Sequence, residues 1–302
     1  KLVVGEEEIY HSCHSKWALS WWNDTAVTVC DKELRLFGPD GSKQTVELDS
    51  QVNELVVGGD RAIAWYTYGE KPVYIINLNT LAVKERLTED ITAATIVGNT
   101  TIFGFKSGKV TAGNRSVEGE LKNVRSLTPS PDGSLVAVRY PTALSILDSA
   151  KLKEQCTVQL PFGLGETAWD PTGSFIVVGG HDWMAPQQIH VSECRLRQTE
   201  AVYSEAPHQV WAPKGQNWLI AANTKTLTAW SLTEQKLIAR ADMSADLMAA
   251  REKGQKVPKY HGGVAIDGFA ASIALGELVV VNELRRRYSR SVPKYLDSWP
   301  EE

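Results

Sequence analysis

The stretch "TPSPDGSLVAV", residues 128–138, places a turn signal directly before a short apolar run. Proline fixes φ and cannot donate to a strand ladder, aspartate satisfies local backbone groups, and glycine adopts the positive φ that closes a tight hairpin. The run that follows, "LVAV", is bounded by turn residues and is too short for a helix. The stretch therefore predicts a β-hairpin whose second strand is buried on both faces.

The same pattern recurs further along the chain. "DPTGSFIVVGG" begins at Asp170 and "APKGQNWLIAA" begins at Ala212, which places Gly133, Gly173 and Gly215 at spacings of 40 and 42 residues. A period of this size is typical of propeller blades or of helical arrays. Because each turn precedes a short strand-like run, the pattern favours the propeller.

Looser copies extend the pattern in both directions, with turns at 23–24, 59–60, 98–99 and 267–268, which makes seven turns in all. Further apolar runs in most units indicate four short strands per unit. The sequence therefore predicts an all-β fold, a single seven-bladed β-propeller domain over residues 1–302. We expect the strand "EIYHSCH", residues 8–14, to pair with the final unit and close the ring.

Composition and charge narrow the classes of partner. The chain has 302 residues, is 43% hydrophobic and carries a formal net charge of −4. A net negative charge provides no broad attraction to phosphate backbones, so we expect no general nucleic-acid binding. The apolar run at 264–281 contains Asp267 and Glu277, whose insertion cost cancels the gain from its apolar side chains, so it predicts two strands and no transmembrane helix.

The cysteine pattern bears on the cellular compartment. The four cysteines lie far apart, with no C-x-x-C pair: Cys13, Cys30, Cys156 and Cys194. We expect reduced thiols in a cytoplasmic protein. Three N-x-[ST] sequons, which matter only in a secreted protein, begin at Asn23, Asn99 and Asn114.

The turn motifs also carry a resemblance to a known family. The "SPDG" turn at 130–133, its relatives "DPTG" and "APKG", and the segment "LTAWSLTEQKL" at 227–237 resemble WD40-type repeats. The early Gly-His dipeptide of typical repeats is missing, and the Trp169-Asp170 pair stands at a turn instead. The resemblance implies a non-catalytic scaffold that presents loops and blade edges to partner proteins in a multiprotein complex.

A narrower resemblance covers one predicted blade. "ALSWWNDTAVTVCDKELRLFGPDG", residues 18–41, is similar to blades in the N-terminal propellers of large vesicle-tethering proteins. It implies, as an alternative function, a role in membrane trafficking, with peripheral membrane association through a complex. The chain would then be the front part of a longer protein.

A propeller hydrolase is a second alternative. His181, Asp182 and His208 are the residues to examine around a central channel, but the sequence nominates no nucleophile or metal aligned with them. His11, Cys13 and His14 are metal-capable and closely spaced, yet a fourth zinc ligand and a recognisable second pair are missing nearby. We therefore expect no enzymatic activity, no metal and no cofactor.

Candidate contacts for partner proteins lie in three places. An aromatic residue and its neighbour follow a predicted strand, two apolar residues lie in a partly helical insertion at 242–260, and four arginines stand near the end of the domain. These partner-binding candidates are Trp183, Met184, Leu247, Met248, Arg285, Arg286, Arg287 and Arg290.

Overall fold

A computed structural model describes residues 2–4, 7–9, 18–23, 25–38, 40–67, 72–87, 90–160, 167–170, 172–178, 187–198, 209–211, 218–222, 226–231, 236–242, 270–273 and 277–280. The chain divides into two compact units. The first unit comprises Lys1–His11, Leu164–His190 and Arg197–Glu302, and the second comprises Ser12–Gly163 and Val191–Leu196.

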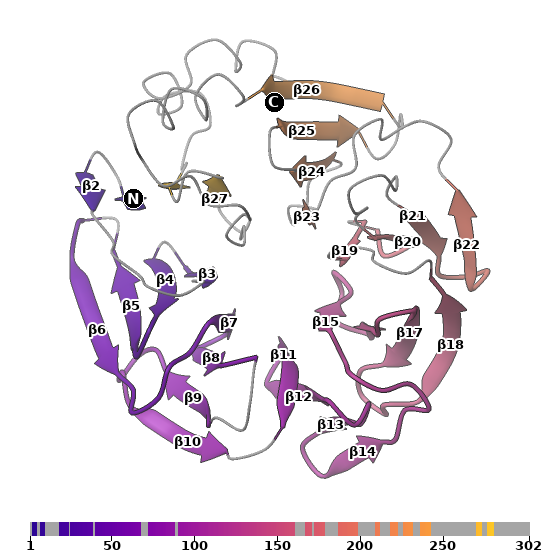
Figure 1. The fold of residues 1–302 in the computed structure, drawn as a ribbon, viewed down its shortest axis with the longest axis horizontal. Coiled ribbons are helices and arrows are strands. Elements are labelled where there is room, and N and C mark those ends of the chain that lie inside the picture. The colour runs from indigo at the N-terminus through magenta and orange to yellow at the C-terminus, as the bar shows by residue number, and fades with distance from the viewer. Residues whose placement is uncertain are drawn as a thin grey trace. The chain divides into compact units, whose positions relative to one another are not determined.

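The described strands form seven sheets of four strands each. No helix occurs among the residues that the structure describes. Four of the sheets lie in the second unit (Figure 1). Their strands are β3 (Ala18–Trp22), β4 (Thr25–Cys30), β5 (Glu33–Phe37) and β6 (Lys43–Glu47); β7 (Glu54–Gly58), β8 (Arg61–Trp65), β9 (Val73–Asn77) and β10 (Val83–Leu87); β11 (Ile91–Val97), β12 (Thr100–Phe105), β13 (Val110–Ala112) and β14 (Arg115–Val117); and β15 (Ser126–Pro129), β16 (Leu135–Arg139), β17 (Ala143–Asp148) and β18 (Glu154–Gln159).

Each of these four sheets is an antiparallel meander in which strands that are consecutive along the chain are neighbours. The first strands of successive sheets contact one another, β3 with β7, β7 with β11, and β11 with β15. The expected organisation of four short strands per unit is therefore confirmed in this part of the chain.

The remaining sheets contain strands of the first unit. These strands are β19 (Thr167–Trp169), β20 (Phe175–Val178), β21 (Gln187–His190) and β22 (Arg195–Gln198); β23 (Gln209–Trp211), β24 (Trp218–Ala222), β25 (Thr226–Ser231) and β26 (Lys236–Asp242); and β1 (Leu2–Val4), β2 (Glu7–Ile9), β27 (Ala270–Ile273) and β28 (Glu277–Val280). Strand β22 begins in the segment assigned to the second unit.

The two ends of the chain share one sheet, with the strand order β2-β1-β28-β27. Strand β1 pairs with β28 in parallel, with Leu2 opposite Leu278, and β2 pairs with β1. The N-terminal segment thus joins the last strands as expected, but its direct partner strand is 2–4 and not 8–14. Residues 10–14 lie outside the described residues.

Two C-terminal expectations meet the structure only in part. In the apolar run 264–281 the described residues form two antiparallel strands, β27 and β28, but residues 274–276 separate them, and the turn expected at 267–268 lies outside the described residues. Among the described residues, no helix has the length and apolar character needed to cross a membrane. Asp242, the first residue of the expected insertion 242–260, is the last residue of β26, and 243–260 lie outside the described residues.

The "SPDG" turn owes its form to side chains that satisfy the backbone. The Gly133 amide donates to the Ser130 carbonyl at 2.9 Å, and Gly133 has a φ of 73°, which confirms the expected role of this glycine. The buried Ser130 Oγ accepts from the Leu135 amide at 2.9 Å. The Asp132 carboxylate accepts from the Ser130 hydroxyl at 2.6 Å and from the Ser134 amide at 3.0 Å.

The "DPTG" turn repeats this arrangement with a different side chain. Gly173 has a φ of 74°, and its amide donates to the Asp170 carbonyl at 3.0 Å. The buried Asp170 accepts from the Phe175 amide at 2.7 Å, as Ser130 accepts from Leu135. In these two turns the first residue therefore caps the amide five positions later, which explains why Ser130 and Asp170 have short oxygen-bearing side chains.

The Asp132 carboxylate in the "SPDG" turn makes the free energy of unfolding depend on pH. Hydrogen bonds from Ser130 and Ser134 lower the pKa of Asp132 to about 2. A lowered carboxylate pKa contributes stability that is complete above the ordinary value near 4 and is lost as the pH falls through about 2. We expect the free energy of unfolding to fall between pH 4 and pH 2 by less in Asp132→Asn than in the wild type, because asparagine does not titrate. Urea unfolding at several pH values measures this, and equal losses in the two proteins would contradict it.

Strand alternation divides the second unit into separate core clusters. In β12, Ile102 points into a cluster with Val110, Val124 and Leu127. Phe103 and Phe105 lie on the other face of β12. They pack with Ile63, Trp65, Val73 and Ile91 instead. Both faces of β12 therefore contact apolar side chains, as expected of a strand buried on two sides.

Candidate functional site

A groove of about 780 Å³ lies in the second unit between the sheet β7–β10 and the sheet β11–β14. This volume is in the range of ligand-binding sites. From the first sheet it is lined by Arg61, Ile75, Asn77, Lys84 and Leu87. From the second sheet and its turns it is lined by Ile91, Asn99, Thr100, Thr101, Phe103, Phe105, Lys109, Thr111 and Gly113.

The floor of the groove follows from strand alternation. Phe103 and Phe105 lie two residues apart on β12, so both project from the same face, and Thr111 of β13 lies opposite Phe103 on that face. Ile75 of β9 contributes from the facing sheet and is buried. The groove is therefore a continuation of the apolar cluster between the two sheets, with Phe103 only half-buried.

Three cationic side chains border this apolar floor. The Lys109 Nζ atom lies 5.7 Å from the centre of the Phe105 ring, a cation–π distance. Lys84 is exposed, and the side chain of Arg61 is 34% exposed. The described residues that line the groove include no carboxylate. Its local charge is therefore positive, although the chain as a whole is negative.

A β-bulge helps to place Lys84. The register between β9 and β10 shifts between Val83, which is opposite Ile76, and Glu85, which is opposite Ile75. The shift leaves Lys84 as an extra residue on β10, and such bulges change the direction in which a side chain points. Lys84 and Leu87 consequently line the same groove although they are three residues apart.

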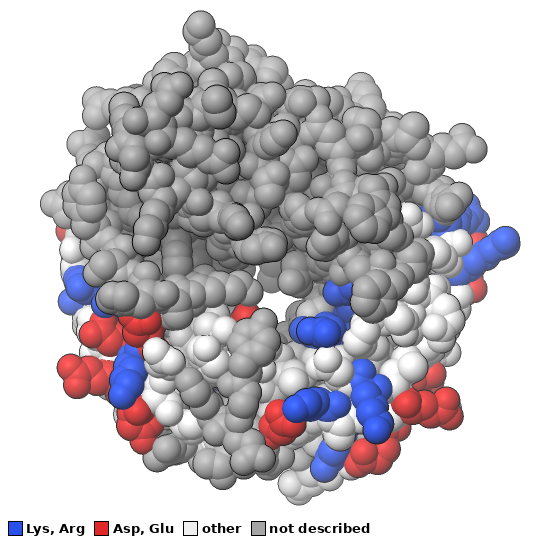
Figure 2. Space-filling model, in the orientation of Figure 1, with Lys and Arg blue, Asp and Glu red and all other residues white. Residues whose placement is uncertain are grey.

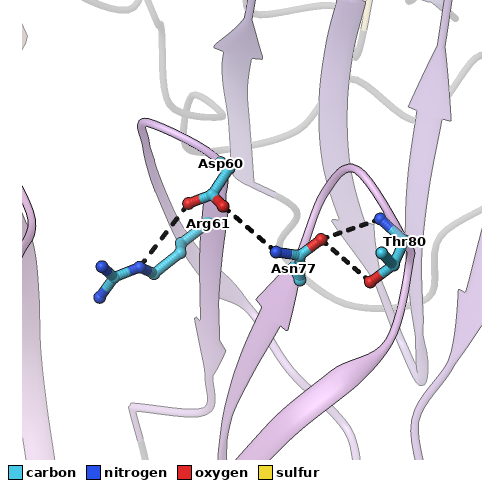
Figure 3. A network of polar contacts seen from close by, with 4 residues as sticks. All are labelled: Asp60, Arg61, Asn77 and Thr80. Atoms are coloured by element: carbon cyan, nitrogen blue, oxygen red, sulfur yellow. Dashed lines mark hydrogen bonds and ion pairs between the residues drawn. The ribbon is translucent and has the colours of Figure 1, made fainter.

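A polar network includes two of the residues that line the groove, Arg61 and Asn77 (Figure 3). Asn77, opposite Arg61 in the strand pairing, donates from Nδ2 to Asp60 Oδ2 at 3.2 Å. Its Oδ1 accepts from the amide and the hydroxyl of Thr80, both at 2.9 Å. Asp60 Oδ1 lies 3.8 Å from the Arg61 Nε atom, and Figure 3 shows the outer guanidinium nitrogens of Arg61 directed away from Asp60. Arg61 is thus oriented and keeps donor groups for another partner.

The wider surface is mixed in sign. Figure 2 shows lysine and arginine side chains interspersed with aspartate and glutamate over the described part of the visible face. Interspersed charges of both signs produce no extended field of one sign. The positive character of the groove is therefore local, and it suits a small number of negative groups.

The structure does not place the residues that the sequence nominated as partner contacts. Trp183, Met184, Leu247, Met248, Arg285, Arg286, Arg287 and Arg290 all lie outside the described residues, and so do His11, Cys13, His14, His181, Asp182 and His208. In the described part of the chain no three His, Cys, Asp or Glu side chains are grouped as metal ligands would be. These candidates remain sequence-based predictions.

Sequence reasoning missed the groove, although part of its signal is visible. The alternation of Thr101, Phe103 and Phe105 marks one face of a strand, and Lys109 and Thr111 continue it after the turn. What the sequence does not show is that this face opposes Arg61 and Lys84 from the preceding sheet.

The cysteines differ from expectation. Cys156 of β18 and Cys194, in the turn before β22, form a disulfide with a Cα–Cα distance of 6.0 Å. Cys30 is also disulfide-bonded, and no described cysteine is a free thiol. The expectation of reduced thiols is therefore wrong for the described cysteines. It failed because the partners are separated by 38 residues and carry no spacing signal.

The three sequon asparagines lie at exposed hairpin tips. Asn23 joins β3 to β4, Asn99 joins β11 to β12 and Asn114 joins β13 to β14. Asn23 has a φ of 50°, a conformation that asparagine tolerates better than most residues. Their occurrence is explained by turn chemistry, and Asn99 additionally lines the groove.

Comparisons with known proteins support the fold. The chain is similar to a chain in a crystal structure of a mitotic checkpoint complex, with a TM-score of 0.63, 15% sequence identity, and coverage of 73% of this chain and 74% of that one. No family model matches the sequence, and no curated protein matches it. Together with the four-stranded sheets, the likeness identifies a WD40-like β-propeller fold.

Proposed function

We propose that the chain is a closed, seven-bladed propeller domain that serves as a non-catalytic scaffold for partner proteins in a multiprotein complex. Support for the ring comes from the seven four-stranded sheets and from the sheet that the two ends of the chain share. The similar fold belongs to a chain of a multiprotein assembly. The expected helical insertion and the basic segment at 285–290 remain further candidate contacts of this scaffold.

The observation that carries the proposal is the groove. Its described lining offers aromatic and aliphatic surface, hydroxyl and amide groups, and cations. Protein interfaces are commonly built from such a mixture, with aromatic residues and arginine enriched at the energetically important positions. The net charge of −4 supports proteins, and not nucleic acids in general, as the partners.

Affinity capture of the full-length protein from its native cells tests the scaffold role. We expect at least one protein to co-purify in stoichiometric amount. Recovery of the chain alone would contradict the proposal and would direct attention to His181, Asp182 and His208, with a hydrolase substrate screen. A variant with Arg285, Arg286 and Arg287 changed to glutamate tests the basic segment, because its partners should be lost selectively if they bind there.

The resemblance to vesicle-tethering propellers is a narrower version of the same proposal. Residues 18–41 contain β3, β4 and β5, three consecutive strands of one sheet. A repeat unit of this kind is compatible with many functions, since folds host unrelated activities. The captured proteins distinguish the two versions of the proposal. Trafficking components among them would support the tethering role. Stoichiometric partners that include no trafficking component would support the general scaffold only.

A further inference from the structure

The groove combines two features that select for a particular ligand chemistry. The half-buried Phe103 and the buried Phe105 provide aromatic lining for the groove. Lys84 and Lys109 border this surface, and Lys109 is already positioned over the Phe105 ring. A ligand that fills the groove therefore gains from an apolar group beside negative charge.

The strand order adds a third feature. Strand β10, which contributes Lys84 and Leu87 to the groove, is the terminal strand in the order β10-β9-β8-β7. A terminal strand presents backbone N–H and C=O groups along its outer edge. Extended peptides bind such edges by adding a strand, while neighbouring pockets select their alternate side chains.

We propose that the groove binds a short extended segment of a partner protein that carries acidic residues beside an aromatic or large aliphatic one. This inference rests on the proposed scaffold function and names the chemistry of one partner. The acidic side chains pair with Lys84 and Lys109, and the apolar side chain packs on Phe103. Arg61, which lines the groove beside Asp60, takes a further carboxylate. Three cations in a mixed-charge surface are too few to follow a nucleic-acid backbone.

The experiment selects peptides with the full-length chain. A displayed library of random nine-residue peptides is enriched on the wild type, and the most enriched peptide, labelled with fluorescein, is titrated by fluorescence anisotropy. We expect Asp and Glu to be enriched beside Phe, Leu or Ile. Affinity should fall at least about tenfold in Lys84→Glu/Lys109→Glu, and it should fall with added salt because screening weakens the pairs.

A matched control changes the same charge elsewhere. Lys32→Glu/Lys122→Glu alters two exposed lysines of the second unit that do not line the groove, and it should keep wild-type affinity. Lys84→Gln/Lys109→Gln, with a smaller expected loss, replaces the first variant if circular dichroism shows that variant to be unfolded. Neutral or basic selected peptides, no enrichment, or equal losses in the groove and control variants would overturn the proposal. If capture from native cells still yields a stoichiometric partner, the scaffold function survives that failure.

The disulfides carry a second, independent inference. Cys156 and Cys194 form one cross-link, and Cys30 forms another. Each bond forms when two thiols lose two protons and two electrons, by exchange with a disulfide-bearing oxidant of the compartment. Stable protein disulfides persist in oxidising compartments and are rare in the reducing cytosol. We infer that this protein folds and works in an oxidising compartment. This proposal takes the place of the cytoplasmic location that was expected from the sequence.

Thiol trapping tests this inference on the native protein. Cells are lysed directly into acid, thiols are blocked with N-ethylmaleimide without a reductant, and the digested full-length protein is analysed by mass spectrometry. We expect a cross-linked peptide pair that contains Cys156 and Cys194, with neither residue alkylated. The same sample treated first with dithiothreitol should show both residues alkylated. Alkylation of both cysteines without reduction would overturn the inference.

Discussion

Replacing Gly108 by alanine is expected to lower the free energy of unfolding by roughly 3 to 5 kcal/mol. Two costs add at this position. Gly108 has a φ of 99°, and a Cβ atom would lie 1.9 Å from the Leu121 carbonyl oxygen, a backbone atom. Because the obstacle belongs to the main chain, a change of side-chain rotamer cannot relieve the contact.

The surroundings of Gly108 explain why its loop cannot simply move. The Gly108 amide donates to the Phe105 carbonyl at 3.0 Å, and the Gly108 carbonyl accepts from the Tyr140 hydroxyl at 3.4 Å. Burial raises the pKa of Tyr140 to about 12, so this hydroxyl stays protonated and able to donate. The Val124 amide also donates to the Phe105 carbonyl at 3.2 Å, which ties the following segment to the same turn.

A second glycine provides the matched control. Gly113 has a φ of 56°, and a Cβ atom there would meet no atom within 4 Å. Gly113→Ala therefore adds backbone strain without a collision and should cost about 1 kcal/mol. Urea unfolding followed by circular dichroism measures both variants. Equal losses in Gly108→Ala and Gly113→Ala would show that the close approach to Leu121 does not matter.

Removing the cross-link in Cys156→Ser/Cys194→Ser should lower the free energy of unfolding by about 4 kcal/mol, because the unfolded chain regains the entropy of an open loop. The estimate uses the separation of 38 residues between the two cysteines. Both cysteines are changed so that no unpaired thiol remains. The bond joins β18, the last strand of its sheet, to the turn before β22, so its loss also frees that turn.

Reduction provides the control for this second prediction. Urea unfolding in the absence of reductant should separate the wild type from the double variant. With dithiothreitol the wild type should lose more stability than the double variant, since it has one more bond to reduce. If the two proteins unfold at the same urea concentration without reductant, the cross-link contributes nothing to stability.

The turns show how much of the fold could be predicted from the sequence. Gly133 and Gly173 occupy the positive φ that the "SPDG" and "DPTG" patterns predict, and the turns at 23–24, 59–60 and 98–99 each join the first two strands of a sheet. Turn conformation depends on the allowed φ and ψ of one or two residues, and strand formation depends on short apolar runs. Both are local properties, so residues a few positions apart contain the information.

The candidate site, unlike the turns, could not be predicted from the sequence. The sequence nominated Trp183, Met248 and the arginines at 285–290 because each stands out within its own segment. The groove instead joins Arg61 and Lys84 to Phe103 and Lys109, none of which is unusual where it stands. A groove forms only where two sheets face each other in a defined arrangement. That arrangement cannot be predicted from the residues of any single segment.

The all-β class, the repeating hairpins and the four-strand units could be predicted from the residues alone, because neighbouring residues set backbone conformation and burial. Three contacts became evident only in the folded chain: Cys156 bonds to Cys194, Gly108 lies against Leu121, and lysines of two sheets line a groove with aromatic residues. Each of these contacts joins segments that the sequence separates. Their distance is set by how whole sheets pack, and packing is a property of the folded chain.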